Sequence, residues 1–187
     1  MLPIYLYGHP LLRNKSVDID PNADYLPALI QQMYQTMYES DGIGLAAPQI
    51  GRNIRLIVID ATPMADQYPE CAGMNLVLIN PYIEEQSGTP VSETEGCLSI
   101  PGIAEPVQRP SRILLRYIDQ QGTEHHESYD GFAARVIQHE YDHLEGVLFT
   151  DRVSPLRRQL IKTKLAAIAR GKVRPHYPSV PPPAKRH

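Results

Sequence analysis

The chain lacks long apolar runs, is poor in cysteine and carries no excess of positive charge, and each absence excludes a class of protein. No apolar stretch in its 187 residues approaches the roughly 20 residues that a transmembrane helix needs. Its start, Met1-Leu2-Pro3-Ile4, has neither the basic nor the apolar region of a secretory signal peptide. The formal net charge of -3 argues against a nucleic-acid binder. We therefore expect a cytoplasmic protein without membrane contact.

The length predicts one domain, which is large enough to bury a core. Proline is frequent, with 18 residues, and much of the excess lies near the C-terminus. We expect a single domain over residues 1–171. Residues 172–187, which include Pro181-Pro182-Pro183 and end in Lys185-Arg186-His187, are expected to form a flexible, proline-rich basic tail.

The spacing of apolar residues predicts both helices and strands. Helices are expected over about residues 24–39, around residues 132–148 with Asp130 as N-cap, and from Ser154-Pro155 to about residue 170. The apolar side of the last helix is expected to consist of Leu156, Leu160, Leu165 and Ile168. Strands are expected over residues 54–60, 76–80, 82–86, 112–119 and 123–129, the last two joined by a hairpin turn.

The clearest chemical signal is the HExxH sequence at residues 139–143, inside the predicted helix around residues 132–148. Residues four apart lie on one face of a helix, with Cβ atoms about 6 Å apart. His139 and His143 can therefore bind one metal ion, and Glu140 stands beside them as a general base. The alternative is an exposed helix that carries two histidines on one side.

A catalytic metal site needs a third protein ligand and one open position. Metzincins supply a third histidine in HExxHxxGxxH. This chain matches that pattern through Gly146 but has Phe149 at the third histidine position. A lone cysteine is most often a small buried apolar residue, yet beside an HExxH helix Cys97 becomes the better candidate for the third ligand. Cys71 and Cys97 could pair with each other only in an oxidising compartment.

Residues 42–51 form a glycine-rich segment that sequence alone leaves open. Glycine permits close approach of another backbone, and it equally suits a tight turn. A phosphate-binding loop is disfavoured because no Lys-Ser/Thr pair follows.

Three segments together resemble the motifs of the peptide deformylase family: GIGLAAPQIG at residues 42–51, EGCLSIPG at residues 95–102 and QHEYDHLEG at residues 138–146. The resemblance implies an α+β fold in which antiparallel sheets surround the central HExxH helix, with an N-terminal and a C-terminal helix. It implies a hydrolase that removes the formyl group, as formate, from the formylmethionine of nascent polypeptides, using a metal-bound water activated by Glu140. The domain over residues 1–171 would then be a metallohydrolase.

The resemblance also implies roles for individual residues. Cys97, His139 and His143 would bind the metal, which in this family is Fe²⁺, with Zn²⁺, Ni²⁺ or Co²⁺ as substitutes. Glu140 would be the catalytic acid and base, while Gln49 and the backbone N–H of Leu98 would stabilise the oxyanion. An extended peptide would pair with exposed backbone in the manner of an added strand. The residues expected to bind substrate are Gly42, Ile43, Gly44, Glu95, Gly96 and Val136.

Two other functions remain open at this point. One is an endopeptidase of the metzincin kind, which Phe149 argues against. The other is a metal-stabilised module that binds the ribosome, although pure binding needs neither Glu140 nor Gln49. The last helix carries Arg157, Arg158, Lys162, Lys164 and Arg170, so it is either a solvated charged face or a ribosome contact.

Overall fold

The structure, a computed structural model, describes residues 1–183 and has the α+β architecture expected from the sequence. Its helices are α1 (Leu26–Glu39), α2 (Gly131–Leu144), α3 (Phe149–Arg152) and α4 (Pro155–Ala169). Its strands are β1 (Ile4–Tyr5), β2 (Gly44–Ala46), β3 (Leu56–Asp60), β4 (Asn75–Ser87), β5 (Val91–Gly96), β6 (Ala104–Arg109), β7 (Arg112–Ile118), β8 (Glu124–Asp130) and β9 (Ser179–Val180). Within the described residues, no helix is both long and apolar enough to cross a membrane.

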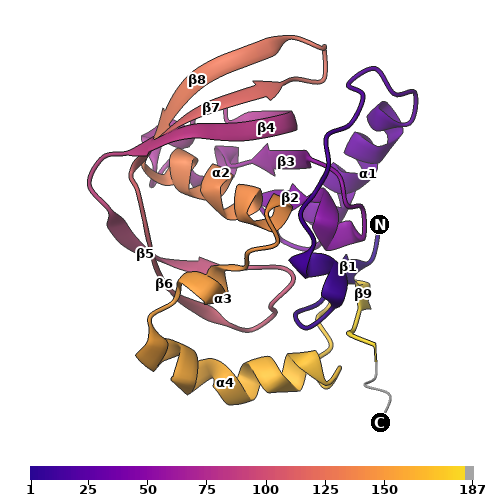
Figure 1. Cartoon of the computed structure of the whole chain (residues 1–187), viewed down its shortest axis with the longest axis vertical. Coiled ribbons are helices and arrows are strands. Elements are labelled where there is room, and N and C mark those ends of the chain that lie inside the picture. The colour runs from indigo at the N-terminus through magenta and orange to yellow at the C-terminus, as the bar shows by residue number, and fades with distance from the viewer. Residues whose placement is uncertain (184–187) are drawn as a thin grey trace.

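The helix α2 lies at the centre, between a large sheet and a smaller hairpin (Figure 1). The large sheet is antiparallel and has the order β2-β3-β4-β7-β8. The hairpin consists of β5 and β6, which pair in antiparallel register from Val91 with Arg109 to Gly96 with Ala104. The expectation of antiparallel sheets around the HExxH helix is therefore confirmed.

Strand β3 explains why the sequence shows a nearly continuous apolar run here. Successive side chains of a strand point to opposite faces of the sheet. Ile57 and Ile59 pack on the α2 side, while Leu56 and Val58 pack on the α1 side. A strand covered by a helix on each face needs apolar residues at every position. This sandwich of α1, sheet and α2 fixes the central helix in place.

Strand β4 corrects one expectation. The sequence predicted separate strands on either side of Pro81, but β4 runs through it from Asn75 to Ser87. Its pairing with β7 shifts register between Ile79 and Tyr82 and again between Ile83 and Glu85. Proline lacks the N–H that a regular ladder needs, and such an irregularity accommodates it. Strands β2, β5 and β6 were not predicted from the sequence.

The start of α2 is held differently from the prediction. Asp130 does occupy the N-cap position, but its side chain makes no capping hydrogen bond and instead pairs with Arg112. The N–H of Phe132 donates to Oε1 of Glu70, at 2.7 Å. A carboxylate from a distant loop therefore satisfies this end of the helix.

The apolar side of α4 also differs from the prediction. Leu165 and Ile168 are buried as expected, and Ile161 completes the buried stripe at helical spacing. Leu156 and Leu160 are 74% and 71% exposed, so they do not share the buried side of the helix with Leu165 and Ile168. The stripe at residues 161, 165 and 168 packs on a cluster that includes Leu6, Ile100 and Val107, and the opposite face is left to solvent.

The residues after α4 do not hang free. Ser179 and Val180 form β9, which pairs in parallel with Ile4 and Tyr5 of β1 (Figure 1). The expectation of a free tail therefore fails for the part of this segment that the structure describes. Residues 184–187 of the expected tail lie outside the described residues. The domain boundary at residue 171 stays a prediction.

Candidate metal centre and active site

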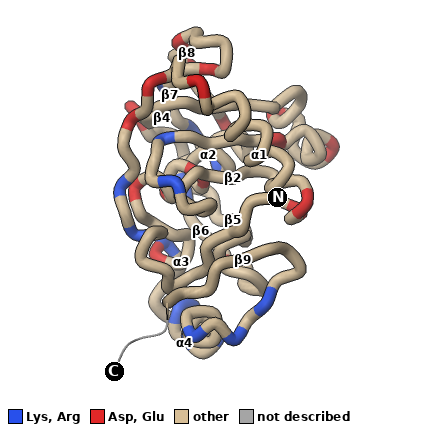
Figure 2. Tube along the Cα trace, turned by 90° about the vertical axis from the view of Figure 1, so that its right-hand side faces the viewer, with Lys and Arg blue, Asp and Glu red and all other residues tan. Residues whose placement is uncertain are grey.

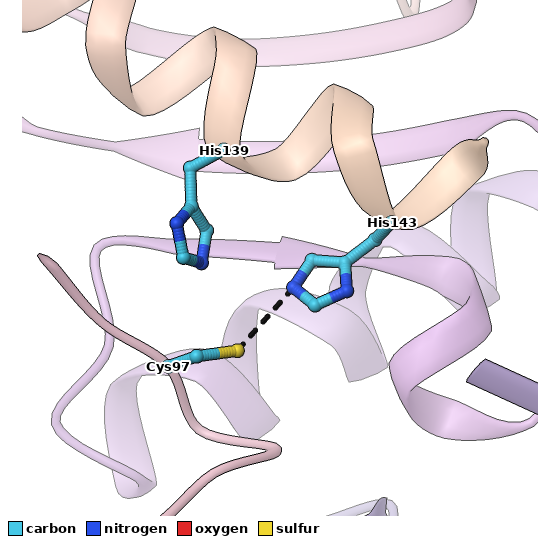
Figure 3. A group of neighbouring side chains, drawn as sticks. All are labelled: Cys97, His139 and His143. Carbon is cyan, nitrogen blue, oxygen red and sulfur yellow. Dashed lines mark hydrogen bonds between the residues drawn. The ribbon is translucent and has the colours of Figure 1, made fainter. Parts of the chain in front are cut away.

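The helix α2 and the turn after β5 bring the predicted metal ligands together. His139 and His143 project from one face of α2, and Cys97 faces them from the turn (Figure 3). The turn is closed by the Ile100 N–H, which donates to the carbonyl of Cys97 at 2.9 Å. The Cys97 sulfur lies 3.3 Å from Nε2 of His143. The thiol and the imidazole nitrogens all fall within 4.8 Å of one another.

These residues fit a divalent metal. Typical bond lengths of about 2.3 Å to sulfur and about 2.1 Å to nitrogen place the two donor atoms of one tetrahedral ion roughly 3.6 Å apart. Burial lowers the pKa of His143, which favours the neutral ring that a metal ligand needs. One thiolate and two imidazoles leave a coordination position open for water or substrate.

A buried carboxylate orients the first histidine. Oε2 of Glu95 lies 2.9 Å from Nδ1 of His139, so this nitrogen carries the proton and Nε2 is free to bind metal. Burial alone raises the pKa of Glu95, but the hydrogen bonds from His139 and Arg109 outweigh it and hold that pKa far below its usual range. Glu95 is therefore ionised and serves as a fixed acceptor.

Two arginines hold Glu95 in turn. Arg109 donates to both of its oxygens, at 2.6 and 2.9 Å, and Arg135 donates to Oε1 at 2.6 Å. Arg109 also donates to Asp142 of the HExxH sequence, at 2.8 Å. These buried charges tie β5 and β6 to α2. Breaking such a network leaves an uncompensated charge in the interior, which is strongly destabilising.

Glu140 is buried beside the ligands, and its pKa is raised to about 7 by burial. Its Oε2 has no hydrogen-bond partner within the described residues. A buried, unpaired carboxylate oxygen is costly unless a water or substrate group occupies the position next to it. Gly44 of β2 packs directly against this carboxylate. Glu140 is thus placed to accept a proton.

Gln49 and Leu98 flank the ligand turn. The Gln49 Oε1 accepts the N–H of Ala46 at 2.9 Å, which turns its Nε2 toward Cys97 and Ser99, at 3.5 and 3.2 Å. The backbone N–H of Leu98 makes no hydrogen bond to protein within residues 1–183. The Leu98 N–H is therefore available to an oxygen near the metal position, and the Gln49 amide could donate to the same oxygen by exchanging one of its two present acceptors.

A cavity of about 830 Å³ opens onto the site. It is lined by every residue that was expected to bind substrate, namely Gly42, Ile43, Gly44, Glu95, Gly96 and Val136. Val136 and Ile43 offer apolar surface, joined by Phe132 and Ile103. Glu95 differs from the rest because its carboxylate is engaged with His139 and the arginines. The structure brings these residues together, and their roles toward substrate stay predictions.

The roles of Arg109 and Arg135 were not predicted from the sequence. Arg109 stands in β6 in phase with the buried Val107 and Glu105, and a charge on the inward face of a strand indicates a buried ion pair. That signal was available, but recognising it required knowing that residues 104–109 form a strand. His125 and His126 lie on β8, away from the site, and pair with Asp119 and with Glu84 of β4.

The metzincin alternative finds no support in this geometry. Phe149, at the position of the third histidine, is buried and its ring stacks near His139, with 6.1 Å between ring centroids. Cys97, from another segment, lies where it could be the third ligand beside His139 and His143. Fold and site together define a class: α+β hydrolases with an HExxH helix and a Cys-His-His set of metal donors.

Comparison with known proteins identifies the family within this class. The sequence profile of the family described as polypeptide deformylase matches residues 1–159. The peptide deformylase of Christiangramia forsetii is 46% identical over 193 residues, covering 100% of this chain and 98% of the relative. That of Salinibacter ruber is 46% identical over 184 residues, covering 96% and 94%. The chain therefore belongs to the polypeptide deformylase family, whose members are hydrolases that remove N-formyl groups from nascent peptides.

Solved structures agree with the fold. A peptide deformylase from Synechococcus elongatus, in complex with actinonin, superposes with a TM-score of 0.79 at 44% identity, covering 93% of this chain and 92% of that one. Peptide deformylase 1B of Arabidopsis thaliana, in complex with an inhibitor, gives a TM-score of 0.80 at 38% identity, covering 91% of each chain.

Proposed function

We propose that this protein removes the formyl group from the N-terminal formylmethionine of nascent polypeptides and releases formate through a metal-dependent hydrolysis. The observation that carries the proposal is the buried, unpaired oxygen of Glu140 beside the Cys97, His139 and His143 donors. A formyl amide is a small carbonyl without side groups, so it can approach a carboxylate this deeply placed. The methionine side chain fits the apolar part of the cavity around Ile43 and Val136.

The chain's own residues supply most of the chemistry. A divalent ion held by Cys97, His139 and His143 would polarise the formyl carbonyl and lower the pKa of water from 15.7 toward about 7. Glu140 accepts the proton of the attacking water and passes it to the leaving amine nitrogen. Gln49 and the Leu98 N–H donate to the carbonyl oxygen as it becomes negative, and one such donor is worth about 3 kcal/mol. A C–O bond forms, the C–N bond breaks, and formate and a free amine leave.

Formate release from formyl-Met-Ala tests the proposal. Glu140→Gln keeps the shape and the metal donors but cannot accept a proton, so turnover should fall by at least about 100-fold while bound metal stays unchanged. Cleavage of internal peptide bonds without release of formate would instead support the endopeptidase alternative.

We propose Fe²⁺ as the native metal, with Zn²⁺, Ni²⁺ or Co²⁺ as substitutes. Thiolate and imidazole donors suit both iron and zinc, so the choice rests on the family rather than on the donor set. Apo-protein reconstituted with Fe²⁺ under argon should be more active than with Zn²⁺, and brief peroxide should inactivate only the iron form. Zinc protein as active as the iron protein, with both indifferent to peroxide, would contradict this assignment.

We also propose that the protein works in the cytoplasm and that α4 contacts the ribosome. Basic residues gather on α4, at the opposite end of the molecule from the acidic β7–β8 end (Figure 2). Arg157 pairs with Glu105 and Arg158 lies 3.6 Å from Asp151, so Lys162 and Lys164 are the freer charges. Reversing all four charges should weaken ribosome co-sedimentation steeply at low salt and spare activity on short peptides. Unchanged sedimentation would contradict the contact.

A further inference from the structure

The segment that follows α4, residues 173–180, is here called the C-terminal strap. It is fastened at both ends. At one end Gly171 terminates α4 in a left-handed conformation, and the Lys172 N–H donates to the carbonyl of Ala167 at 3.0 Å. At the other end the N–H of Ile4 donates to the carbonyl of Pro178 at 2.9 Å, within the pairing of β1 with β9. Both ends of the strap are therefore held by backbone hydrogen bonds.

Between its two ends the strap reaches the active-site cavity. Residues 173–177 line the same cavity as His139 and Glu140. Tyr177 is only 7% exposed, and its hydroxyl donates to the carbonyl of Leu98 at 2.6 Å. Leu98 directly follows the metal ligand Cys97. The strap is thus joined to the catalytic turn by a buried hydrogen bond.

The strap also meets the other lip of the cavity. The side chain of Leu98 packs against Gly42, where an added Cβ would lie 2.8 Å from its Cδ1. Next to this point, Nε2 of His176 lies 3.4 Å from Oδ2 of Asp41. The strap therefore extends from the turn after β5 to the loop at residues 40–42. That loop leads into Ile43 and Gly44, which are expected to bind substrate.

The strap presents one free positive charge to the cavity. Arg174 is exposed and lines the cavity, and no carboxylate within residues 1–183 forms an ion pair with it. Lys172 carries the same charge two residues earlier, is also exposed and does not line the cavity. The two residues thus form a matched pair that differs in access to the cavity.

The cavity is larger than one side chain requires. Its volume of about 830 Å³ lies in the upper part of the range of about 300–1,000 Å³ that is typical of whole ligands. A formylated peptide whose carbonyl reaches the metal donors and whose methionine fills the apolar part must lead its following residues out of this cavity. The strap forms one wall of the cavity that they can contact.

Resting on the proposed function, we propose that the C-terminal strap is a substrate-binding wall for the residues that follow the formylmethionine. Tyr177 holds it against the catalytic turn, and Arg174 favours peptides with an acidic side chain after the second residue. Because Arg174 is exposed, its attraction is screened and the selectivity amounts to a few-fold.

The test compares kcat/KM for formyl-Met-Ala-Asp, formyl-Met-Ala-Lys and formyl-Met-Ala on the metal-loaded full-length protein. We expect wild-type protein to prefer the aspartate peptide to the lysine peptide by about fivefold at low salt. Arg174→Glu should reverse this preference, and Lys172→Glu should leave the ratio unchanged. A ratio of two substrates measured on one preparation does not depend on how much of the protein is folded.

Tyr177→Phe tests the attachment of the strap, because it keeps the buried ring and loses the hydrogen bond to Leu98. The ratio of kcat/KM for formyl-Met-Ala-Asp to that for formyl-Met-Ala should fall about threefold. An unchanged ratio would overturn the role of Tyr177. Equal ratios in wild type and Arg174→Glu, or an equal shift with Lys172→Glu, would overturn the strap as a selective wall.

The same assay distinguishes failure of the proposed deformylase function from failure of the strap's proposed role. Wild-type protein that releases no formate from formyl-Met-Ala would overturn the proposed function and the strap's role together. Formate release from formyl-Met-Ala with identical kcat/KM on all three peptides would overturn the strap's role alone.

Discussion

Gly44 of β2 and Glu140 of α2 are packed so closely that a side chain at position 44 would enter the active site. A Cβ built on Gly44 would lie 2.5 Å from Oε1 of Glu140, a distance that real Cβ atoms essentially never show. Glu140 is buried, with 5% of its surface exposed. Glycine at this position therefore leaves room for the Glu140 carboxylate, which we propose to be catalytic.

Gly44→Ala should displace Glu140 and lower kcat by about 100-fold, since a shift of about 1 Å at a catalytic group can cost that much. Steady-state kinetics with formyl-Met-Ala measures the loss. The shorter side chain of Glu140→Asp leaves room for the added methyl group, so Gly44→Ala should cost much less in that background. Equal losses in both backgrounds would show that the clash is not with the carboxylate.

Cys97→Ala should abolish stable metal binding, because two histidines alone make a poor site. Cys71 provides the matched control: it is a free cysteine buried in the core and is not one of the grouped metal donors, so Cys71→Ala should retain metal. Metal content after dialysis, measured by elemental analysis, distinguishes the two variants. Full occupancy in Cys97→Ala would place the third ligand elsewhere.

Glu95→Gln should weaken metal binding by about 10–100-fold, because it removes the charge that orients His139 and leaves Arg109 without its main partner. Glu93→Gln is the control on the same strand: Glu93 lies 3.5 Å from Arg135 and makes no contact with His139. Competition with a chelator measures the affinity, and circular dichroism confirms folding. Equal affinities in the two variants would contradict the orienting role.

Asp151 should contribute to stability above about pH 4. Burial opposes its ionisation, but hydrogen bonds from Arg13 and the Leu148 N–H outweigh this and lower its pKa. A depressed pKa in the folded state stabilises the protein above the unfolded pKa of about 3.9, and the effect is lost as pH falls through the folded pKa. Asp151→Asn should lower the free energy of unfolding at pH 7 by about 0.5–1 kcal/mol, after allowance for solvent screening.

Urea unfolding between about pH 3 and pH 7 checks this prediction, because this interval spans the ordinary aspartate pKa of about 3.9. The difference between Asp151→Asn and wild type should shrink as the solution becomes acidic. Asp66→Asn is the control, because Asp66 is exposed and forms no ion pair within residues 1–183. A difference in the free energy of unfolding that is constant with pH would show that the ionised form of Asp151 does not contribute the stability assigned to it.

The catalytic centre was accessible to sequence reasoning because its spacing is local. His139, Glu140 and His143 lie within one helical turn, and helix geometry alone places both histidines on one face. Likewise, the apolar run of β3 signals a strand covered on both sides, whichever elements cover it. Predicting Cys97 required two further arguments: the rule that a catalytic metal takes a third protein ligand, and the resemblance to a known family.

What sequence reasoning missed depends on contacts between distant segments. The hairpin β5–β6 is polar, so its own sequence does not show that Glu95 and Arg109 face inward. Their inward position depends on contact with α2, where Arg109 pairs with Asp142 as well as with Glu95. On α4, Leu156 and Ile161 are equally apolar, and only the position of the neighbouring cluster decides which is buried. Tyr177 carries no local signal at all, since its partner Leu98 lies far away in the chain.

The pairing of β1 with β9 has a consequence for how the protein is made. Ile4 cannot find its partner Ser179 until nearly the whole chain has left the ribosome. Pairings this distant in sequence are entropically costly and tend to form late in folding. An incompletely synthesised chain can assemble the metal donors, which end at His143, before the strap closes the outer cavity wall. The newly made protein would therefore bring Cys97, His139 and His143 together before the strap lines the cavity.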